Sequence, residues 1–165
     1  MRHYIVGLLI AGVSIAAAPS RIATEFAARW TKTRPMMMGV AEAMPAGQYA
    51  FRPDPPSMTF GEQILHIVQT NQAFCEGLKD RLAARVQSTT DRATLVKLLG
   101  ESFDTCAATI GSLTDAELDA VHNSPDGRMP GREVLLALYA HMAHHRGQME
   151  VYLRIKGIAP PGYIF

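Results

Sequence analysis

The sequence predicts an all-α fold, a four-helix bundle, and three observations support this prediction. Apolar residues recur at helical spacing in four long stretches of the chain, whereas no alternating pattern typical of β-strands has any length. Segments rich in proline and glycine separate these stretches, as expected for loops. With 165 residues, 48% hydrophobic and 19% charged, the chain has the size and composition of one globular domain.

The first 18 residues, MRHYIVGLLIAGVSIAAA, have the layout of a secretory signal peptide. Arg2 gives a positive start, an apolar run follows, and small residues offer a site for cleavage. The run is shorter than the ~20 apolar residues of a membrane span. We therefore expect residues 19–165 to form the domain and the mature protein to be exported to the periplasm. The alternative is an uncleaved apolar helix packed on the domain of a cytoplasmic protein.

The first predicted helix of the domain runs from about Ser20 to Met44. Pro35 lies inside it and lacks the backbone N–H that a helix interior requires, which predicts a kink or a break near Arg34. Four prolines exclude a helix from residues 45–58, where Tyr49–Arg52 is expected to be extended.

The second predicted helix begins with a capping box. Thr59 and Glu62 have the T-x-x-E spacing in which each side chain accepts a hydrogen bond from the other residue's backbone N–H. An apolar stripe predicts that the helix continues to about Val86. The residues of this stripe are Phe60, Ile64, Ile67, Phe74, Leu78 and Leu82.

The second half of the chain contains two further long helices. The first spans about Asp91–Ile110, and Thr114 with Glu117 can cap a short helical turn after it. The segment HNSPDGRMPG, residues 122–131, is predicted to be a loop. The last helix is expected over Arg132–Lys156.

Charge and cysteine content limit the possible partners and compartments. The net charge is +1 and the basic residues are spread along the chain, so the concentrated basic face that binds nucleic acid is not expected. Cys75 and Cys106 both fall in predicted helices. They can pair in an oxidising space or remain buried thiols, and we favour buried, unpaired thiols.

Three of the six histidines lie close together in the last helix, in the segment YAHMAHHRGQM. At about 100° per residue, His145 lies about 40° from His141 on the side of the apolar stripe, whereas His144 lies about 60° on the other side. His141 and His145 therefore point into the bundle, and a surface role suits His144 better. Buried imidazoles need hydrogen-bond partners or a metal ion. Residues four apart on a helix can bind one divalent ion together.

A metal site needs a third ligand, and spacing alone leaves its identity open. His66 lies on the flank of the apolar stripe of the second helix, whereas His122 falls in a predicted loop. Helix geometry permits a trio of His66, His141 and His145 only if the order and stagger of the helices agree. Three core histidines with no metal are the alternative.

The segments YAFRPDPPSMTFGEQILHIVQTNQAF and HMAHHRGQMEVYLRIKGIAPP resemble the DinB/YfiT-like superfamily, whose pattern the chain follows in order from about Thr24 to Pro161. The resemblance implies a four-helix bundle in which three histidines bind one divalent metal ion. By position these are His66, His141 and His145. It also implies a homodimer.

The implied site has three histidines and no fourth protein ligand, which is typical of a catalytic metal with open positions for water or substrate. Such a metal acidifies bound water and deprotonates a bound thiol. Three imidazoles suit Zn, Ni or Fe without choosing among them. Glu62, Gln148 and Tyr152 are the candidate catalytic residues around the ion, although the capping box is the more ordinary role for Glu62.

Two functions of different classes follow from these features. The first is a metal-dependent enzyme that acts on a small molecule, with a thiol as one candidate substrate. The relatives implied by the resemblance include thiol S-transferases and metal-dependent hydrolases. The second is a non-catalytic helical protein that binds a small molecule, with or without a metal. An enzyme requires a solvent-reachable cleft with polar groups beside the metal, whereas the binding protein requires only an apolar pocket.

Overall fold

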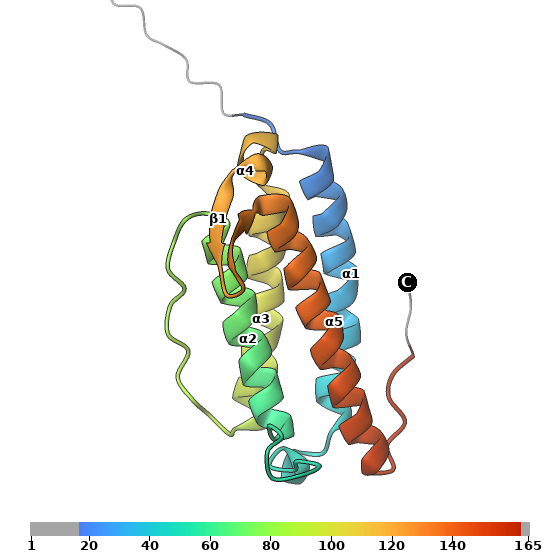
Figure 1. Cartoon of the computed structure of the whole chain (residues 1–165). Helices are drawn as coiled ribbons and strands as arrows, with labels where there is room; N and C mark the ends of the chain where they lie inside the picture. Colours follow the sequence, from blue (N-terminus) through green and yellow to red (C-terminus); the bar gives the residue numbers. More distant parts are fainter. Residues whose placement is uncertain (1–16, 163–165) are drawn as a thin grey trace, which may run out of the picture.

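The computed structural model describes residues 17–162, in which four long helices dominate (Figure 1). In chain order the elements are α1 (Arg21–Ala43), the 3-10 turn η1 (Ala46–Gln48), α2 (Phe60–Gly77), α3 (Arg92–Gly111), α4 (Asp115–Asp119), β1 (Val121–Ser124), β2 (Gly127–Pro130) and α5 (Gly131–Ile155). The predicted bounds of the first, third and last long helices are thus confirmed to within one residue. The expected signal peptide falls almost entirely on residues 1–16, which lie outside the described residues.

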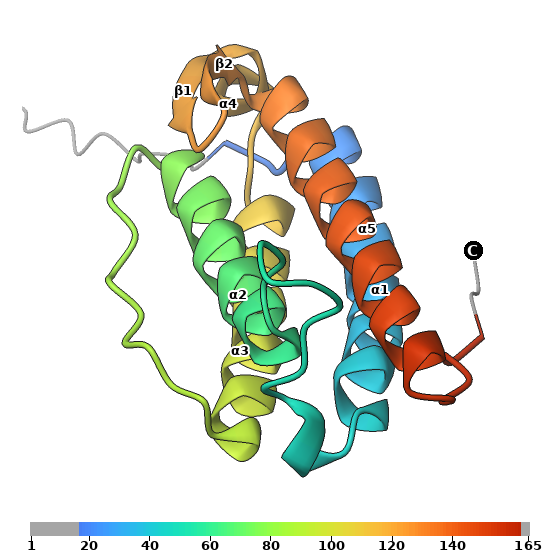
Figure 2. The same cartoon turned by 60° about the horizontal axis from the view of Figure 1, so that its bottom comes forward.

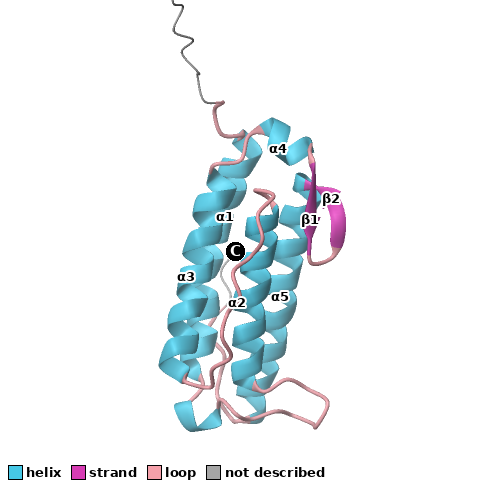
Figure 3. Cartoon of the chain, turned by 90° about the vertical axis from the view of Figure 1, so that its left-hand side faces the viewer, coloured by secondary structure: helices cyan, strands magenta, loops and turns pink. Residues whose placement is uncertain are grey.

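The long helices lie side by side, and each contacts two of the others (Figure 3). α1 and α2 each pack against both α3 and α5, so the apolar stripes meet in a shared core. In that core Trp30 stacks on Phe103 with ring centroids 4.7 Å apart. The Trp30 Nε1 donates to the Phe103 carbonyl at 3.1 Å, which satisfies the only polar group of this fully buried side chain. No helix among residues 17–162 combines the length and hydrophobicity needed to cross a membrane.

α1 continues through Pro35, so of the kink or break predicted near Arg34 the break does not occur. Proline removes one backbone hydrogen bond from a helix interior. The helix persists because it buries side chains on both sides of that point, including Trp30 and Thr33 before it and Met37 and Val40 after it. Packing of an amphipathic face is what stabilises most helices in proteins, and here it offsets the lost bond.

After α1 the chain forms a 3-10 turn that continues into Tyr49, whereas Tyr49–Arg52 was predicted to be extended. Tyr49 follows η1 with helical angles of φ −66° and ψ −22°, and its backbone N–H donates to the Ala46 carbonyl at 3.2 Å. Its buried hydroxyl donates to the Ala41 carbonyl of α1 at 2.7 Å. This bond holds Tyr49 against α1, and Phe51 and Arg52 then connect this turn to the segment before α2.

α2 begins as predicted but ends at Gly77, well before Val86. Both halves of the Thr59–Glu62 capping box are present. At the other end, a Cβ on Gly77 would lie 2.2 Å from the carbonyl oxygen of Asn123, because β1 packs directly on this glycine. Asp80 then takes a left-handed conformation with φ 53°, and the chain leaves the helix. Leu82, predicted to lie on the apolar stripe, is 97% exposed.

A β-hairpin occupies most of the predicted loop 122–131. β1 and β2 pair antiparallel, from Val121 opposite Pro130 to Ser124 opposite Gly127. Pro125 and Asp126 form the connection, and Gly127 has the positive φ of +107° that suits glycine. Each strand has four residues, which is too short to show an alternating pattern in the sequence. The prediction of a loop without strands was therefore wrong.

Cys75 of α2 and Cys106 of α3 form a disulfide, so the prediction of unpaired thiols is wrong. Their Cα atoms are 5.5 Å apart, within the range that a disulfide spans. Both residues face the contact between α2 and α3 and are almost completely buried.

Candidate metal centre

Three histidines from two helices converge where α2 and α5 pack together, and of these His145 is buried while His66 and His141 are partly buried. His66 comes from α2, and His141 and His145 come from α5; these two helices lie side by side (Figure 2). One ring nitrogen from each lies within 4.8 Å of the others. The ring centroids are 5.0 Å apart for His66 and His141, 4.6 Å for His66 and His145, and 4.4 Å for His141 and His145. The structure therefore brings together the three histidines that the sequence singled out.

The surroundings keep these three rings uncharged. Burial lowers the pKa of His66. Burial, followed by the proximity of His66, lowers the pKa of His141 to about 4. Burial, followed by the proximity of His141, lowers the pKa of His145 to about 3. All three are thus neutral at neutral pH, and neutral imidazole is the form that binds metal ions.

The hydrogen bonding of the rings is incomplete without a further partner. The Nε2 atoms of His66 and His141 face each other at 3.0 Å, and a single proton or a shared cation can lie between them. Nδ1 of His141 is buried and has no hydrogen-bond partner among the described residues. Buried polar nitrogens are normally satisfied. A divalent ion fits this trio, because the Nε2 atoms of His66 and His141 already face each other and one ion can accept a lone pair from each of them.

Gln63 is the site residue that the sequence analysis missed. It lies one turn before His66 on α2, and its Oε1 accepts a hydrogen bond from Nδ1 of His145 at 2.6 Å. This bond fixes the tautomer of His145, with the proton on Nδ1 and the lone pair on Nε2. A weak signal was present in the sequence, since Gln63 lies three residues after Phe60 and four before Ile67, on the predicted apolar stripe. In the structure it is only 4% exposed.

The amide of Gln63 continues a directed chain of hydrogen bonds to the surface. Its Nε2 donates to Oε1 of Gln148 at 3.0 Å, and Nε2 of Gln148 donates to Nε2 of His144 at 2.9 Å. With His145 donating to Gln63, the three bonds of this chain run in one direction, from His145 to His144. His144 therefore lies at the exposed end of the network, as its helical angle predicted.

Of the other two candidate catalytic residues, Tyr152 contacts Gln63 beside His145, whereas Glu62 is bonded to Thr59 and Arg52 at the start of α2. Tyr152 is buried near Gln63, with Nε2 of Gln63 at 3.5 Å from its hydroxyl, and that hydroxyl donates to the Met58 carbonyl at 2.7 Å. Glu62 points to the start of α2, where its carboxylate accepts from the Thr59 N–H at 2.6 Å and pairs with Arg52 at 3.3 Å. The hydrogen bond from Thr59 lowers the pKa of Glu62.

A shallow hollow of about 470 Å³ adjoins the trio at His145. It lies between α5 and the segment of residues 56–58, which precedes α2. Figure 2 shows this loop coming forward between α2 and α5. Gln63, Gln148 and Tyr152 also line the hollow, so polar side chains and one buried imidazole of the trio are reachable from the surface.

Residues 29–149 match the DinB superfamily, which is more than half of the chain, and the chain belongs to this superfamily. It is similar to the uncharacterized protein YjoA of Bacillus subtilis (strain 168), with 28% identity over 123 residues that cover 72% of this chain and 80% of that relative.

Two crystal structures share this fold. One is a DinB-like protein, YjoA, from Bacillus subtilis, with a TM-score of 0.71 and 23% identity over 84% of this chain and 96% of the other. The second is a DinB-like protein from Bacillus cereus ATCC 10987, with a TM-score of 0.73 and 22% identity over 84% of this chain and 95% of the other.

Proposed function

We propose that this protein is a metal-dependent enzyme built on a four-helix bundle, in which His66, His141 and His145 bind one divalent ion, Zn, Ni or Fe. The convergence of three neutral imidazole nitrogens within 4.8 Å supports this proposal. Among the described residues the group contains no fourth histidine, cysteine or carboxylate. A site with three protein ligands leaves a position for water or substrate, which is the arrangement of catalytic rather than structural metals.

The proposed reaction is a thiol transfer or a hydrolysis. A bound divalent ion would supply a deprotonated thiol or an acidified water at neutral pH. Gln63 holds the ring of His145 in one orientation, and Gln148 and Tyr152 present an amide and a hydroxyl to a molecule in the adjoining hollow. Glu62 is proposed as a base only in second place, because its carboxylate is already engaged by Thr59 and Arg52.

The alternative is a non-catalytic protein that binds an apolar small molecule. The polar groups beside His145 favour the enzyme, since an apolar ligand has no use for two amide side chains and a hydroxyl next to a buried imidazole. The expected homodimer stays a prediction.

We also propose that the protein is exported. The buried Cys75–Cys106 disulfide supports this location, because such bonds persist in oxidising compartments and are rare in the cytosol. The signal-peptide layout of residues 1–18 supports it independently.

Metal analysis of untagged protein tests the proposed site. We expect about one divalent ion per chain in the natural protein and in the control variant His144→Ala, and close to none in His141→Ala, since two ligands hold a metal far less tightly than three. Circular dichroism and a thermal melt check that His141→Ala is folded. Equal metal content in the folded His141→Ala variant and in the natural protein contradicts the proposal.

A further inference from the structure

The two histidines that α5 contributes to the trio differ in how their second ring nitrogen is held. Nδ1 of His145 donates to Gln63 at 2.6 Å, whereas Nδ1 of His141 is buried and finds no partner among residues 17–162. Nε2 of His141 faces Nε2 of His66 at 3.0 Å, so Nε2 would give its lone pair to a shared ion and the proton would lie on Nδ1. Histidines that bind metals almost always donate this second N–H to a carboxylate, a carbonyl or a water. His141 therefore requires a further acceptor.

The β-hairpin covers the side of the trio on which His141 lies. β1 packs on α2 and α5, and β2 packs on α5 (Figure 1). The Asn123 carbonyl lies against Gly77 at the end of α2, whereas the hollow of about 470 Å³ adjoins the start of α2 and is lined by His145 but not by His141. Since α5 follows directly after β2, His141 is also the nearer of the two α5 ligands along the helix. The hairpin is thus the element from which an acceptor can approach His141.

Asp126 lies in the turn between the two strands of the hairpin. Its backbone N–H donates to the Ser124 hydroxyl at 3.2 Å, and that hydroxyl donates to the Gly127 carbonyl at 2.7 Å, so the turn has a defined shape. Asp126 is exposed, and within the described part of the chain no hydrogen bond or ion pair holds its carboxylate. This carboxylate is therefore available to a donor on the helices that the hairpin covers.

The charge of Asp126 acts on His141. Burial, followed by the proximity of His66, lowers the pKa of His141, whereas the negative charge of Asp126 opposes this shift. Charges that lie far apart are screened by water and ions, so an effect of this kind comes from a nearby group. The turn therefore brings its carboxylate towards the ring whose Nδ1 lacks an acceptor.

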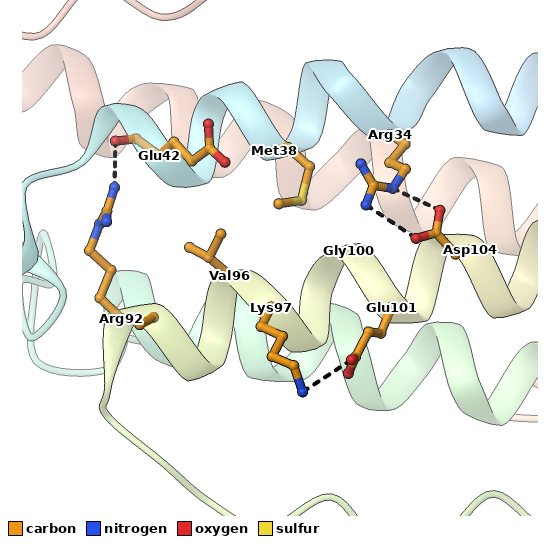
Figure 4. Close-up of a pocket in the computed structure, with 10 residues that line it drawn as sticks. Arg34, Met38, Glu42, Arg92, Val96, Lys97, Gly100, Glu101 and Asp104 are labelled. Carbon is orange, nitrogen blue, oxygen red and sulfur yellow. Dashed lines mark hydrogen bonds and ion pairs between the residues drawn. The ribbon is translucent and has the colours of Figure 1, made fainter.

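Two carboxylates on the opposite side of the bundle have partners of their own. In a hollow of about 590 Å³ between α1 and α3, Asp104 pairs with Arg34 at 2.8 Å and Glu101 pairs with Lys97 at 3.2 Å (Figure 4). The contact between α1 and α3 lies across the core from the contact between α2 and α5. Asp104 is thus a matched control for Asp126, because it is also an exposed aspartate but lies away from the trio.

We propose that Asp126 is a positioning residue for His141, and that its carboxylate accepts a hydrogen bond from Nδ1–H when His141 binds the metal ion. No bond of the carboxylate to another described residue has to break first. The hydrogen bond fixes the tautomer of His141, as Gln63 fixes that of His145, so each of the two α5 ligands is held from a different element. The carboxylate also offsets part of the charge of the divalent ion. This inference rests on the proposed function.

Metal binding by variants at residue 126 tests this inference. We expect Asp126→Ala to lower the affinity for Zn²⁺ by roughly 10–100-fold, the usual effect of removing such a partner. Asp126→Asn keeps an acceptor oxygen without the charge and should lose less. The control Asp104→Ala, which removes only an exposed ion pair between α1 and α3, should bind Zn²⁺ as tightly as the natural protein. Competition titration with a chelating dye measures each affinity.

A spectroscopic measurement separates a hydrogen bond to His141 from a general effect of charge or stability. In Zn²⁺-loaded protein with ¹⁵N-labelled histidines, the Nδ1–H proton of His141 gives its own NMR signal. We expect this signal to move upfield and to exchange faster with water in Asp126→Ala, because the proton loses its acceptor. In Asp104→Ala the signal should stay where it is in the natural protein.

The two proposals fail in different ways. A natural protein that binds no divalent ion contradicts the metal site itself. If Zn²⁺ is bound but Asp126→Ala binds it equally tightly, or leaves the Nδ1–H signal of His141 unchanged, the inference about Asp126 is wrong. A loss of affinity of the same size in Asp104→Ala would also overturn it, because the effect would then not arise at the turn of the hairpin.

Discussion

A single glutamine, Gln63, connects the two helices of the candidate site. Its Oε1 accepts from His145 and its Nε2 donates to Gln148 and, at 3.5 Å, to the Tyr152 hydroxyl, so it bonds from α2 to three side chains of α5. Groups that hydrogen-bond to metal-binding histidines set the orientation and tautomer of the ring. Gln63 is therefore a positioning residue for His145.

Replacement of Gln63 should weaken metal binding without removing a ligand. We expect Gln63→Leu to lower the affinity for Zn²⁺ by roughly 10–100-fold, the usual effect of losing such a partner. Gln63→Glu keeps an acceptor for His145 Nδ1 and should lose less. Competition titration with a chelating dye measures both.

The control for these variants is Gln69→Leu, an exposed glutamine on the same helix. Its Zn²⁺ affinity should match that of the natural protein. An unchanged affinity in Gln63→Leu would mean that the hydrogen bond to His145 does not influence the metal site.

The histidine trio could be predicted from the sequence, whereas Gln63 was missed. His141 and His145 are four apart on one helix, and the resemblance to a known superfamily supplied His66. Glutamine is usually exposed on helices, so the position of Gln63 three residues before His66 did not by itself indicate a role in the site. Only the side-by-side placement of α2 and α5 shows that its amide reaches His145.

Among the helices, the start of the short helix α4 is held by the carboxylate of Glu117. Glu117 closes the capping box of α4 with Thr114, and it also bonds Lys79 at 2.8 Å, just beyond α2. The hydrogen bond from Lys79, followed by that from the Thr114 backbone, lowers the pKa of Glu117 from 4.5 to about 2. The ionised form is therefore the one that the folded protein favours.

This shift predicts a loss of stability in acid. Because the folded pKa is below the unfolded one, the contribution of Glu117 is complete above about pH 4.5 and is lost as the pH falls towards about 2. Glu117→Gln should therefore reduce the difference in urea midpoint between pH 6 and pH 3. Glu101→Gln, which removes only an exposed pair within α3, should leave that difference nearly unchanged. Equal responses of the two variants to acid would contradict this role of Glu117.

The end of α2 and the hairpin depend on each other, and this is why both predictions were wrong. The apolar residues Leu78 and Leu82 extended the helical pattern past Gly77. In the structure the Asn123 carbonyl of β1 lies against Gly77, so a contact between segments distant in the sequence decides where the helix ends. Local spacing cannot report such a contact.

At the scale of the whole molecule, the Cys75–Cys106 disulfide links α2 to α3 across 31 positions of sequence. Closing a loop of this length restricts the unfolded chain and is expected to stabilise the fold by ~3–4 kcal/mol. The sequence could not predict that Cys75 and Cys106 pair, because a disulfide requires that α2 and α3 be neighbours with these two residues facing each other.

Urea unfolding with and without a reductant tests this contribution. The reductant should lower the free energy of unfolding of the natural protein by ~3–4 kcal/mol. The double variant Cys75→Ala/Cys106→Ala should unfold identically with and without it. A natural protein whose unfolding is unaffected after complete reduction, verified by thiol titration, would show that the bond adds nothing to stability.

The hollow beside His145 has no Asp, Glu, Lys or Arg on its lining, and this has a kinetic consequence. Charged clefts attract oppositely charged molecules from a distance, and dissolved salt weakens that attraction. The lining side chains themselves are amides, hydroxyls, imidazoles and aliphatic carbons. A bound divalent cation would therefore be the main source of such attraction, and the rate at which an anion enters would then fall as the ionic strength rises.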